Sequence, residues 1–246
     1  MPTNIDEEFA EAMRYIGGKR PVEINPDVSN TLNADIILPD DGVILEVKTL
    51  MSDPSHQSGH IEKVSAIYHK WAGLPGVPIA FGEVTIDTSG VPEKMAFELL
   101  RTLSGPIRAG VTKSNKQIRE LKKSLGMPKA HGVLVMCNAG ATTLTPHFVM
   151  HALHHALGKR HSSINSLIYL TYGVPVKMPR LPEPVEFFAT LTREGGEPLP
   201  PGLGRRIQDA WMRHQSRNGG LVKVYQKQDI EMIYEGKNVK PAAGRA

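Results

Sequence analysis

A two-stranded hairpin is encoded by the stretch Asn33-Ala-Asp35-Ile-Ile-Leu-Pro-Asp-Asp-Gly-Val-Ile-Leu-Glu46-Val-Lys48-Thr-Leu50. Residues 34–38 are apolar apart from Asp35, residues 39–42 form a Pro-Asp-Asp-Gly turn signal, and residues 43–47 are apolar apart from Glu46. Because both runs are nearly continuous, we expect both strands to lie inside a sheet that is covered on two faces.

Three charged side chains interrupt this hairpin: Asp35, Glu46 and Lys48. Glu46 and Lys48 are two residues apart, so on a strand both point to the same face, and the short turn brings Asp35 back towards Glu46. Two carboxylates in apolar surroundings repel each other, and burial disfavours their ionised forms. A divalent cation removes that cost, and Mg²⁺ prefers oxygen ligands of this kind. The structural alternative is a buried ion pair of Lys48 with Asp35 or Glu46.

The order of these residues resembles the PD-(D/E)xK nuclease superfamily. Its pattern here is Asp35, ten intervening residues, and Glu46-Val47-Lys48 at the end of an apolar strand, most similar to the Holliday-junction resolvase branch. The resemblance covers roughly residues 1–50 well, the later core loosely and the C-terminal part not at all. The literal Pro-Asp pairs end at Asp27 and Asp40, but we assign the acidic position to Asp35 because it lies inside the hairpin.

The resemblance implies a restriction-endonuclease-like α/β fold and metal-dependent hydrolysis of nucleic-acid phosphodiester bonds, with DNA as the expected substrate. Asp35, Glu46 and the backbone carbonyl of Val47 would hold Mg²⁺ or Mn²⁺, while Lys48 would position the attacking water or stabilise the transition state. A glutamate on the first helix often joins such a site, and Glu8 is the candidate here. Acidic residues in a first helical turn are also usual without any such role, because they favour the helix dipole.

Two further expectations concern the function and the assembly of the whole protein. A catalytically inactive nucleic-acid-binding or scaffold protein of the same fold is the alternative function. Many enzymes of this fold dimerise to cut two strands, so a homodimer is compatible with the expectation.

Candidate substrate contacts follow from polar and basic residues elsewhere. A helix is predicted to start at Ser114, which forms an S-x-x-Q capping box with Gln117. The outer side of this helix is basic, so Lys116, Gln117 and Arg119 are candidates for contacts with substrate phosphates. A solvated basic face and a purely capping Gln117 are the structural alternatives. Ser29 lies in a polar loop and could reach a phosphate oxygen or make a local turn.

The composition is that of an ordinary folded protein. The chain has 246 residues, of which 40% are hydrophobic and 22% charged, enough for one large domain or a domain with an appendage. A net charge of +4 and a pI of about 9.1 are compatible with a nucleic-acid partner. The single cysteine, Cys137, cannot form an internal disulfide. No signal peptide or membrane-spanning run is recognisable, so we expect a cytoplasmic protein without a membrane partner.

Apolar periodicity divides the chain into helices and strands. The predicted helices cover residues 4–16, 61–71, 92–103, 114–125, 146–157 and 205–217. The predicted strands cover residues 21–25, 34–38, 43–48, 78–86, 131–137, 166–172, 185–191, 221–225 and 230–234. We expect residues 1–173 to form a nuclease-like domain with a central mixed sheet, flanking helices and an insertion at about residues 51–110. Residues 174–236 would then be a C-terminal extension beyond the compact core, followed by a disordered tail over residues 237–246.

The helix predicted over residues 146–157 carries four histidines, His147, His151, His154 and His155. His147 and His151, like His151 and His155, are one helical turn apart, a spacing that can hold Zn²⁺. No acidic residue or cysteine lies nearby in the sequence, and the HExxH motif is absent. A zinc-binding protein that does not depend on Asp35 is therefore a third candidate function.

Overall fold

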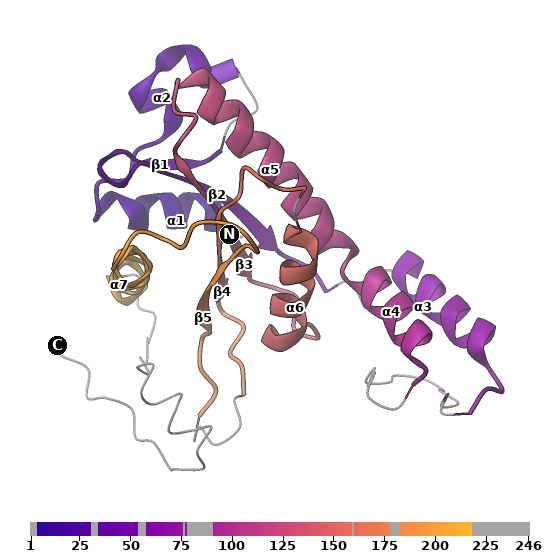
Figure 1. The fold of residues 1–246 in the computed structure, drawn as a ribbon. Coiled ribbons are helices and arrows are strands. Elements are labelled where there is room, and N and C mark those ends of the chain that lie inside the picture. Colours follow the sequence, from indigo (N-terminus) through magenta and orange to yellow (C-terminus); the bar gives the residue numbers. More distant parts are fainter. Residues whose placement is uncertain are drawn as a thin grey trace.

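A five-stranded mixed sheet with strand order β1-β2-β3-β4-β5 forms the centre of the protein (Figure 1). The computed structural model describes residues 4–30, 34–53, 58–75, 77, 91–158, 160–177 and 183–217. β2 (Val43–Leu50), β3 (His131–Asn138) and β4 (Ser166–Thr171) are parallel, while β1 (Ile36–Leu38) and β5 (Phe188–Thr192) are antiparallel edge strands. The predicted α/β class with a mixed central sheet is therefore confirmed.

Helices cover the sheet and extend beyond it. They are α1 (Ile5–Arg14), α2 (Pro21–Ile24), α3 (Ser58–Trp71), α4 (Glu93–Leu103), α5 (Gly105–Ser124), α6 (Pro146–Leu157) and α7 (Leu203–Arg217), with short 3-10 helices η1 (Pro26–Asn30) and η2 (Pro39–Asp41). Among the described helices, none is both long and apolar enough to cross a membrane.

The predicted hairpin is confirmed. Ile36 pairs with Leu45, and Leu38 pairs with Val43. The turn consists of η2 and Gly42, whose φ of 63° is a left-handed conformation that glycine adopts without steric cost. β2 then pairs in parallel with β3 along its whole length, so this hairpin joins the centre of the sheet.

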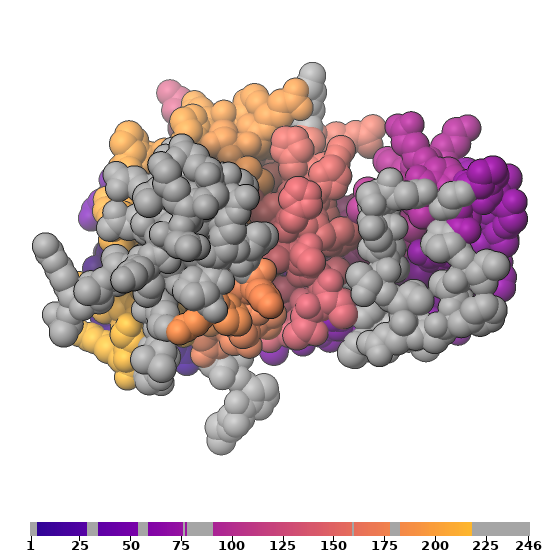
Figure 2. All heavy atoms as spheres, turned by 90° about the horizontal axis from the view of Figure 1, so that it is seen from below, coloured from indigo at the N-terminus to yellow at the C-terminus, as the bar shows by residue number. Residues whose placement is uncertain are grey.

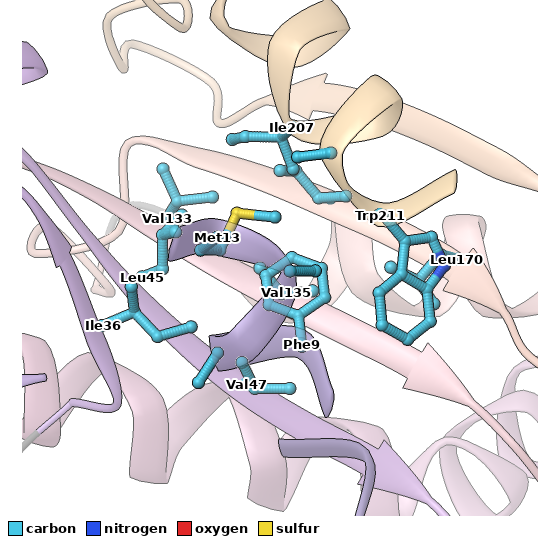
Figure 3. Close-up of a cluster of buried hydrophobic side chains, with 14 of the residues drawn as sticks. Phe9, Met13, Ile36, Leu45, Val47, Val133, Val135, Leu170, Ile207 and Trp211 are labelled. Carbon is cyan, nitrogen blue, oxygen red and sulfur yellow. The ribbon is translucent and has the colours of Figure 1, made fainter. Parts of the chain in front are cut away.

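α1 and α7 cover one face of the sheet. Figure 3 shows Phe9 of α1 and Trp211 of α7 packed over the apolar side chains of the central strands, and their ring centroids lie 5.5 Å apart. Leu203 and Ile207 of α7 are fully buried in the same cluster. The prediction that the compact core ends before residue 174 is therefore wrong. α1 is short, and α7 supplies the apolar surface that completes the cover of this face.

α5 and α6 cover the opposite face, where Ile107, Val111 and Ile118 of α5 are fully buried. α5 begins at Gly105-Pro106, with proline in the first turn, where its missing N–H costs nothing. Ser114 consequently lies in the middle of the helix, and the predicted capping box with Gln117 is wrong. The apolar stripe that includes Ile107 and Val111 continues the helix towards its N-terminus, which outweighs the local capping signal.

α3 and α4 pack against each other and project from the sheet as a helical arm, at the opposite end of the molecule from α7 (Figure 1). α4 leads through Ser104 directly into α5. Seen from below, α6 lies between this arm and β4–β5 (Figure 2). The helices predicted over residues 61–71 and 92–103 are confirmed.

The strand predicted over residues 21–25 is wrong, because this segment is the one-turn helix α2. Pro21 occupies the start of the helix, and the Glu23 carboxylate accepts a hydrogen bond from the Arg20 backbone N–H at 2.7 Å. These two start signals outweigh the apolar alternation of the segment. The strands predicted over residues 78–86, 221–225 and 230–234, and the tail over 237–246, lie outside the described residues.

Candidate active site

The hairpin brings Asp35 and Glu46 together at the middle of β2. Continuing the register in which Ile36 pairs with Leu45 places Asp35 opposite Glu46, and the Asp35 N–H donates to the Leu45 carbonyl at 3.1 Å. The Val47 N–H donates to Asp35 Oδ2 at 2.7 Å, which fixes the orientation of that carboxylate. The predicted convergence of the two carboxylates is therefore observed.

Lys48 joins the same group. Its ammonium forms an ion pair with Glu46 and donates to the Val47 carbonyl at 3.1 Å. The Glu46 side chain is 0% exposed, whereas the Lys48 side chain is 22% exposed. Lys48 therefore lies between the buried carboxylate and solvent. The ion pair predicted as the structural alternative is present, and it involves Glu46.

The environment of the pair disfavours negative charge. Burial, and next the negative charge of Asp35, raise the pKa of Glu46 from 4.5 to about 8, although Lys48 opposes the shift. Burial also raises the pKa of Asp35, against the hydrogen bond from Val47. Glu46 Oε2 is buried and receives no hydrogen bond from any described residue. If both carboxylates were ionised, they would carry more negative charge than Lys48 compensates, and a bound cation would stabilise that doubly ionised state.

The chemistry of the group fits Mg²⁺ or Mn²⁺. Two carboxylates and the Val47 carbonyl are oxygen ligands of the kind that Mg²⁺ prefers, and Mg²⁺ usually keeps several waters in addition. Within the described ranges, no three or more His, Cys, Asp or Glu side chains are arranged to hold a metal ion. The protein would therefore contribute few ligands, leaving the remaining positions to water and to substrate phosphate.

Glu8, which we expected at this site, is instead hydrogen-bonded to His214 of α7. The acidic residue of α1 that lies close to the site is Asp6. It accepts a hydrogen bond from the Thr49 hydroxyl at 3.0 Å, and its charge contributes to the raised pKa of Asp35. Sequence reasoning missed Asp6, although it precedes the buried Phe9 by three residues, which puts it beside the apolar stripe of α1.

The predicted substrate contacts are not gathered around this group. On α5, Gln117 is buried, whereas Lys116 and Arg119 are exposed, and Arg119 pairs with Glu120 at 3.3 Å. No contact joins Lys116 or Arg119 to Asp35, Glu46 or Lys48 in the part of the chain that is described. Ser29 lies in η1, and its side chain is outside the described part of the structure.

α5 approaches the site at Gly110. A Cβ atom at this position would lie 4.0 Å from Lys48 Cγ and 3.3 Å from Met136 Cε. α5 therefore passes over the stem of Lys48 at van der Waals distance, and a side chain at position 110 would be crowded by Met136 instead.

The loops after β2 and β3 are tied together beside the site. Asp53 is 6% exposed and accepts a hydrogen bond from the Thr143 N–H at 2.7 Å. A Cβ atom at Gly140 would lie 2.1 Å from the Met51 carbonyl oxygen, so this close approach requires glycine. The partners are about ninety residues apart, and no local pattern predicts their contact.

The four histidines of α6 do not complete a zinc site. His151 and His155 lie with ring centroids 4.4 Å apart, and burial and the neighbouring histidines lower the pKa of His151. Among the described residues these histidines have no further ligand placed to complete a metal site. The spacing predicted from the sequence is therefore present without the shell that zinc requires.

No family model matches the chain, and no curated protein or solved structure was found to match it. The functional argument consequently depends on the residues of the site itself.

Proposed function

We propose that this chain is a metal-dependent endonuclease that hydrolyses DNA phosphodiester bonds on a restriction-endonuclease-like core. The observation that carries the proposal is the fully buried Glu46 opposite the half-buried Asp35, with Lys48 beside them, on the central strand β2. An ion pair with a purely structural role needs only one carboxylate. A second carboxylate opposite the first adds electrostatic repulsion, which a bound cation would remove.

Asp35, Glu46 and the Val47 carbonyl would hold Mg²⁺ or Mn²⁺, which when bound lowers the pKa of a water and neutralises charge on the phosphate. The Val47 N–H keeps Asp35 in a fixed orientation, so one ligand is preorganised by the strand itself. Lys48 reaches towards solvent, where its ammonium orients the attacking water or stabilises charge that develops on the phosphate oxygens. With a cation held by Glu46, Lys48 would no longer be needed as its ion-pair partner and would be available for this role.

The proposal is tested by incubating supercoiled plasmid with the purified protein and Mg²⁺ or Mn²⁺. Glu46→Gln and Lys48→Met each remove one charge from the site, and Glu7→Gln and Lys123→Met are matched controls at exposed positions of α1 and α5. We expect the wild type and both controls to nick or linearise the plasmid. We expect both site variants to lose at least about a hundredfold in rate, the scale typical of removing one charge-stabilising group.

Metal binding provides a readout that is independent of cleavage. Calorimetric titration with Mn²⁺ should show binding to the wild type and to Glu7→Gln, and none to Glu46→Gln. Equal cleavage by the wild type and Glu46→Gln would contradict the proposal, because the activity would then arise elsewhere.

A catalytically inactive nucleic-acid-binding protein is the second candidate. It is favoured by the observation that, among the described residues, no third acidic or histidine ligand joins Asp35 and Glu46. This candidate predicts binding of duplex, junction or single-stranded DNA without cleavage in the presence of either metal.

A further inference from the structure

An open groove lies between the helical arm and the start of α5. It encloses about 650 Å³ and is lined by residues of α3, α4 and α5. Its lining includes Lys63, Glu98, Arg101, Arg108 and Ala109. The groove belongs to the arm rather than to the sheet, so the site described above does not account for it.

The charged side chains in the described lining of this groove are mainly cationic. Lys63 of α3, Arg101 of α4 and Arg108 of α5 contribute positive charge from three helices, and all three residues are exposed. None of these three cations forms an ion pair with any described residue. Glu98 is the acidic residue of the described lining, and it is engaged by Lys70 at 2.6 Å.

α5 borders both the groove and the proposed active site. Ala109 lines the groove, and the next residue, Gly110, is where α5 passes over the stem of Lys48. Neighbouring residues of one helix therefore border the groove and the proposed active site. An extended ligand with its reacting group at Lys48 would reach the groove by following α5. The polyanion that the proposed reaction uses has this repeated, extended form.

We propose that the groove binds the phosphate backbone of the DNA strand that flanks the scissile phosphate. This inference rests on the proposed function, since it names a second contact for the same substrate. Arg101 and Arg108 are suited to the role because guanidinium groups bind phosphate in a bidentate manner. Contacts of this kind fix the position of the nucleic acid without reading its sequence.

The test is equilibrium binding of fluorescein-labelled DNA, single-stranded and duplex, by anisotropy in EDTA, where no cleavage takes place. The variant is Arg101→Gln/Arg108→Gln, and the matched control is Arg205→Gln/Arg213→Gln, which removes the same charge from exposed positions of α7. We expect the groove variant to bind at least about tenfold more weakly and to show a salt dependence, d log K/d log[salt], that is shallower by about 2, because each lost phosphate contact changes that slope by about 0.9. The control should retain the wild-type slope.

Cleavage of plasmid by the same proteins separates this inference from the proposed function. If the wild type binds DNA and the groove variant matches the control in affinity and slope, the groove is not the binding site, whether or not the protein cleaves. If the wild type binds through the groove but cleaves nothing with Mg²⁺ or Mn²⁺, the nuclease proposal fails and the groove assignment stands. If the wild type binds no DNA, the groove assignment is overturned. Circular dichroism of both variants confirms that any loss does not arise from unfolding.

Discussion

Replacing Glu46 by Gln removes a buried carboxylate whose ionisation the folded protein disfavours. Glu46 is 0% exposed, Asp35 lies opposite it, and one of its oxygens receives no hydrogen bond from the described residues. Glutamine has nearly the same shape and no charge. Without metal, we therefore expect Glu46→Gln to be more stable than the wild type at neutral and alkaline pH, although it should be inactive as a nuclease.

The magnitude follows from the pKa of Glu46, which burial and the charge of Asp35 raise from 4.5 to about 8. An acid with a higher pKa in the folded state binds more protons when folded, so the free energy of unfolding falls as pH rises between the two pKa values. This contribution is fully present below the unfolded pKa and is lost as pH rises through the folded value. Each pKa unit corresponds to about 1.4 kcal/mol, so Glu46 alone should lower the wild-type free energy of unfolding by about 3–4 kcal/mol between about pH 5 and about pH 8.

The assay is urea denaturation of the wild type, Glu46→Gln and the exposed-site control Glu7→Gln at several pH values in EDTA. The wild type and the control should share a decline in the free energy of unfolding towards alkaline pH, and Glu46→Gln should lack the Glu46 part of it. Saturating Mn²⁺ should then restore stability to the wild type at about pH 8, by about 3 kcal/mol at a hundred times its dissociation constant, and should leave Glu46→Gln unchanged.

Two results would refute this reasoning. A Glu46→Gln variant with the wild-type pH dependence would show that Glu46 is ionised in the folded protein without cost. A variant that is less stable than the wild type at about pH 8 would show that the ion pair with Lys48 outweighs the burial of charge.

Three further predictions concern the residues that position the site and the core. Asp35→Ala should lower the free energy of unfolding by about 1–3 kcal/mol in urea denaturation, because the Val47 N–H loses its acceptor, whereas Asp35→Asn should retain most of it. Trp211→Ala should cost about 3–5 kcal/mol and expose α7 to amide hydrogen exchange, and unchanged exchange would contradict the packing of α7 on α1. Gly132→Ala should lower the thermal midpoint by several degrees in scanning calorimetry, because its Cβ would lie 2.0 Å from the Ser163 carbonyl oxygen. An unchanged midpoint would mean that the segment before β4 moves away from β3 without cost.

Local sequence predicted the hairpin and its register because the turn is short. The Pro-Asp-Asp-Gly segment leaves little choice of pairing, and a one-residue slip would turn Glu46 and Lys48 to the opposite face. The same regularity predicted that Asp35 lies beside Glu46. The helices α3, α4 and α6 also agreed with their apolar periodicity, since each follows from spacing within a few turns.

Contacts between distant segments could not be predicted in this way. Whether Asp6 or Glu8 lies near the site depends on the orientation of α1 about its own axis on the sheet. His214, the hydrogen-bond partner of Glu8, lies 206 residues away in the sequence. The position of Ser114 inside α5 depends on the apolar face that the helix buries against β2 and β3. The hydrogen bond between Asp53 and Thr143 likewise requires two loops to meet at one end of the sheet.

The sequence by itself determined a buried hairpin with two facing carboxylates and a lysine, because alternation and turn chemistry act over a few residues. Tertiary structure alone decided that α7 closes the core over α1, which acidic residue of α1 approaches the site, and that the arm and α5 form a basic groove. Those outcomes depend on the packing of whole helices against the sheet, where each contact is weak and only their sum selects one arrangement.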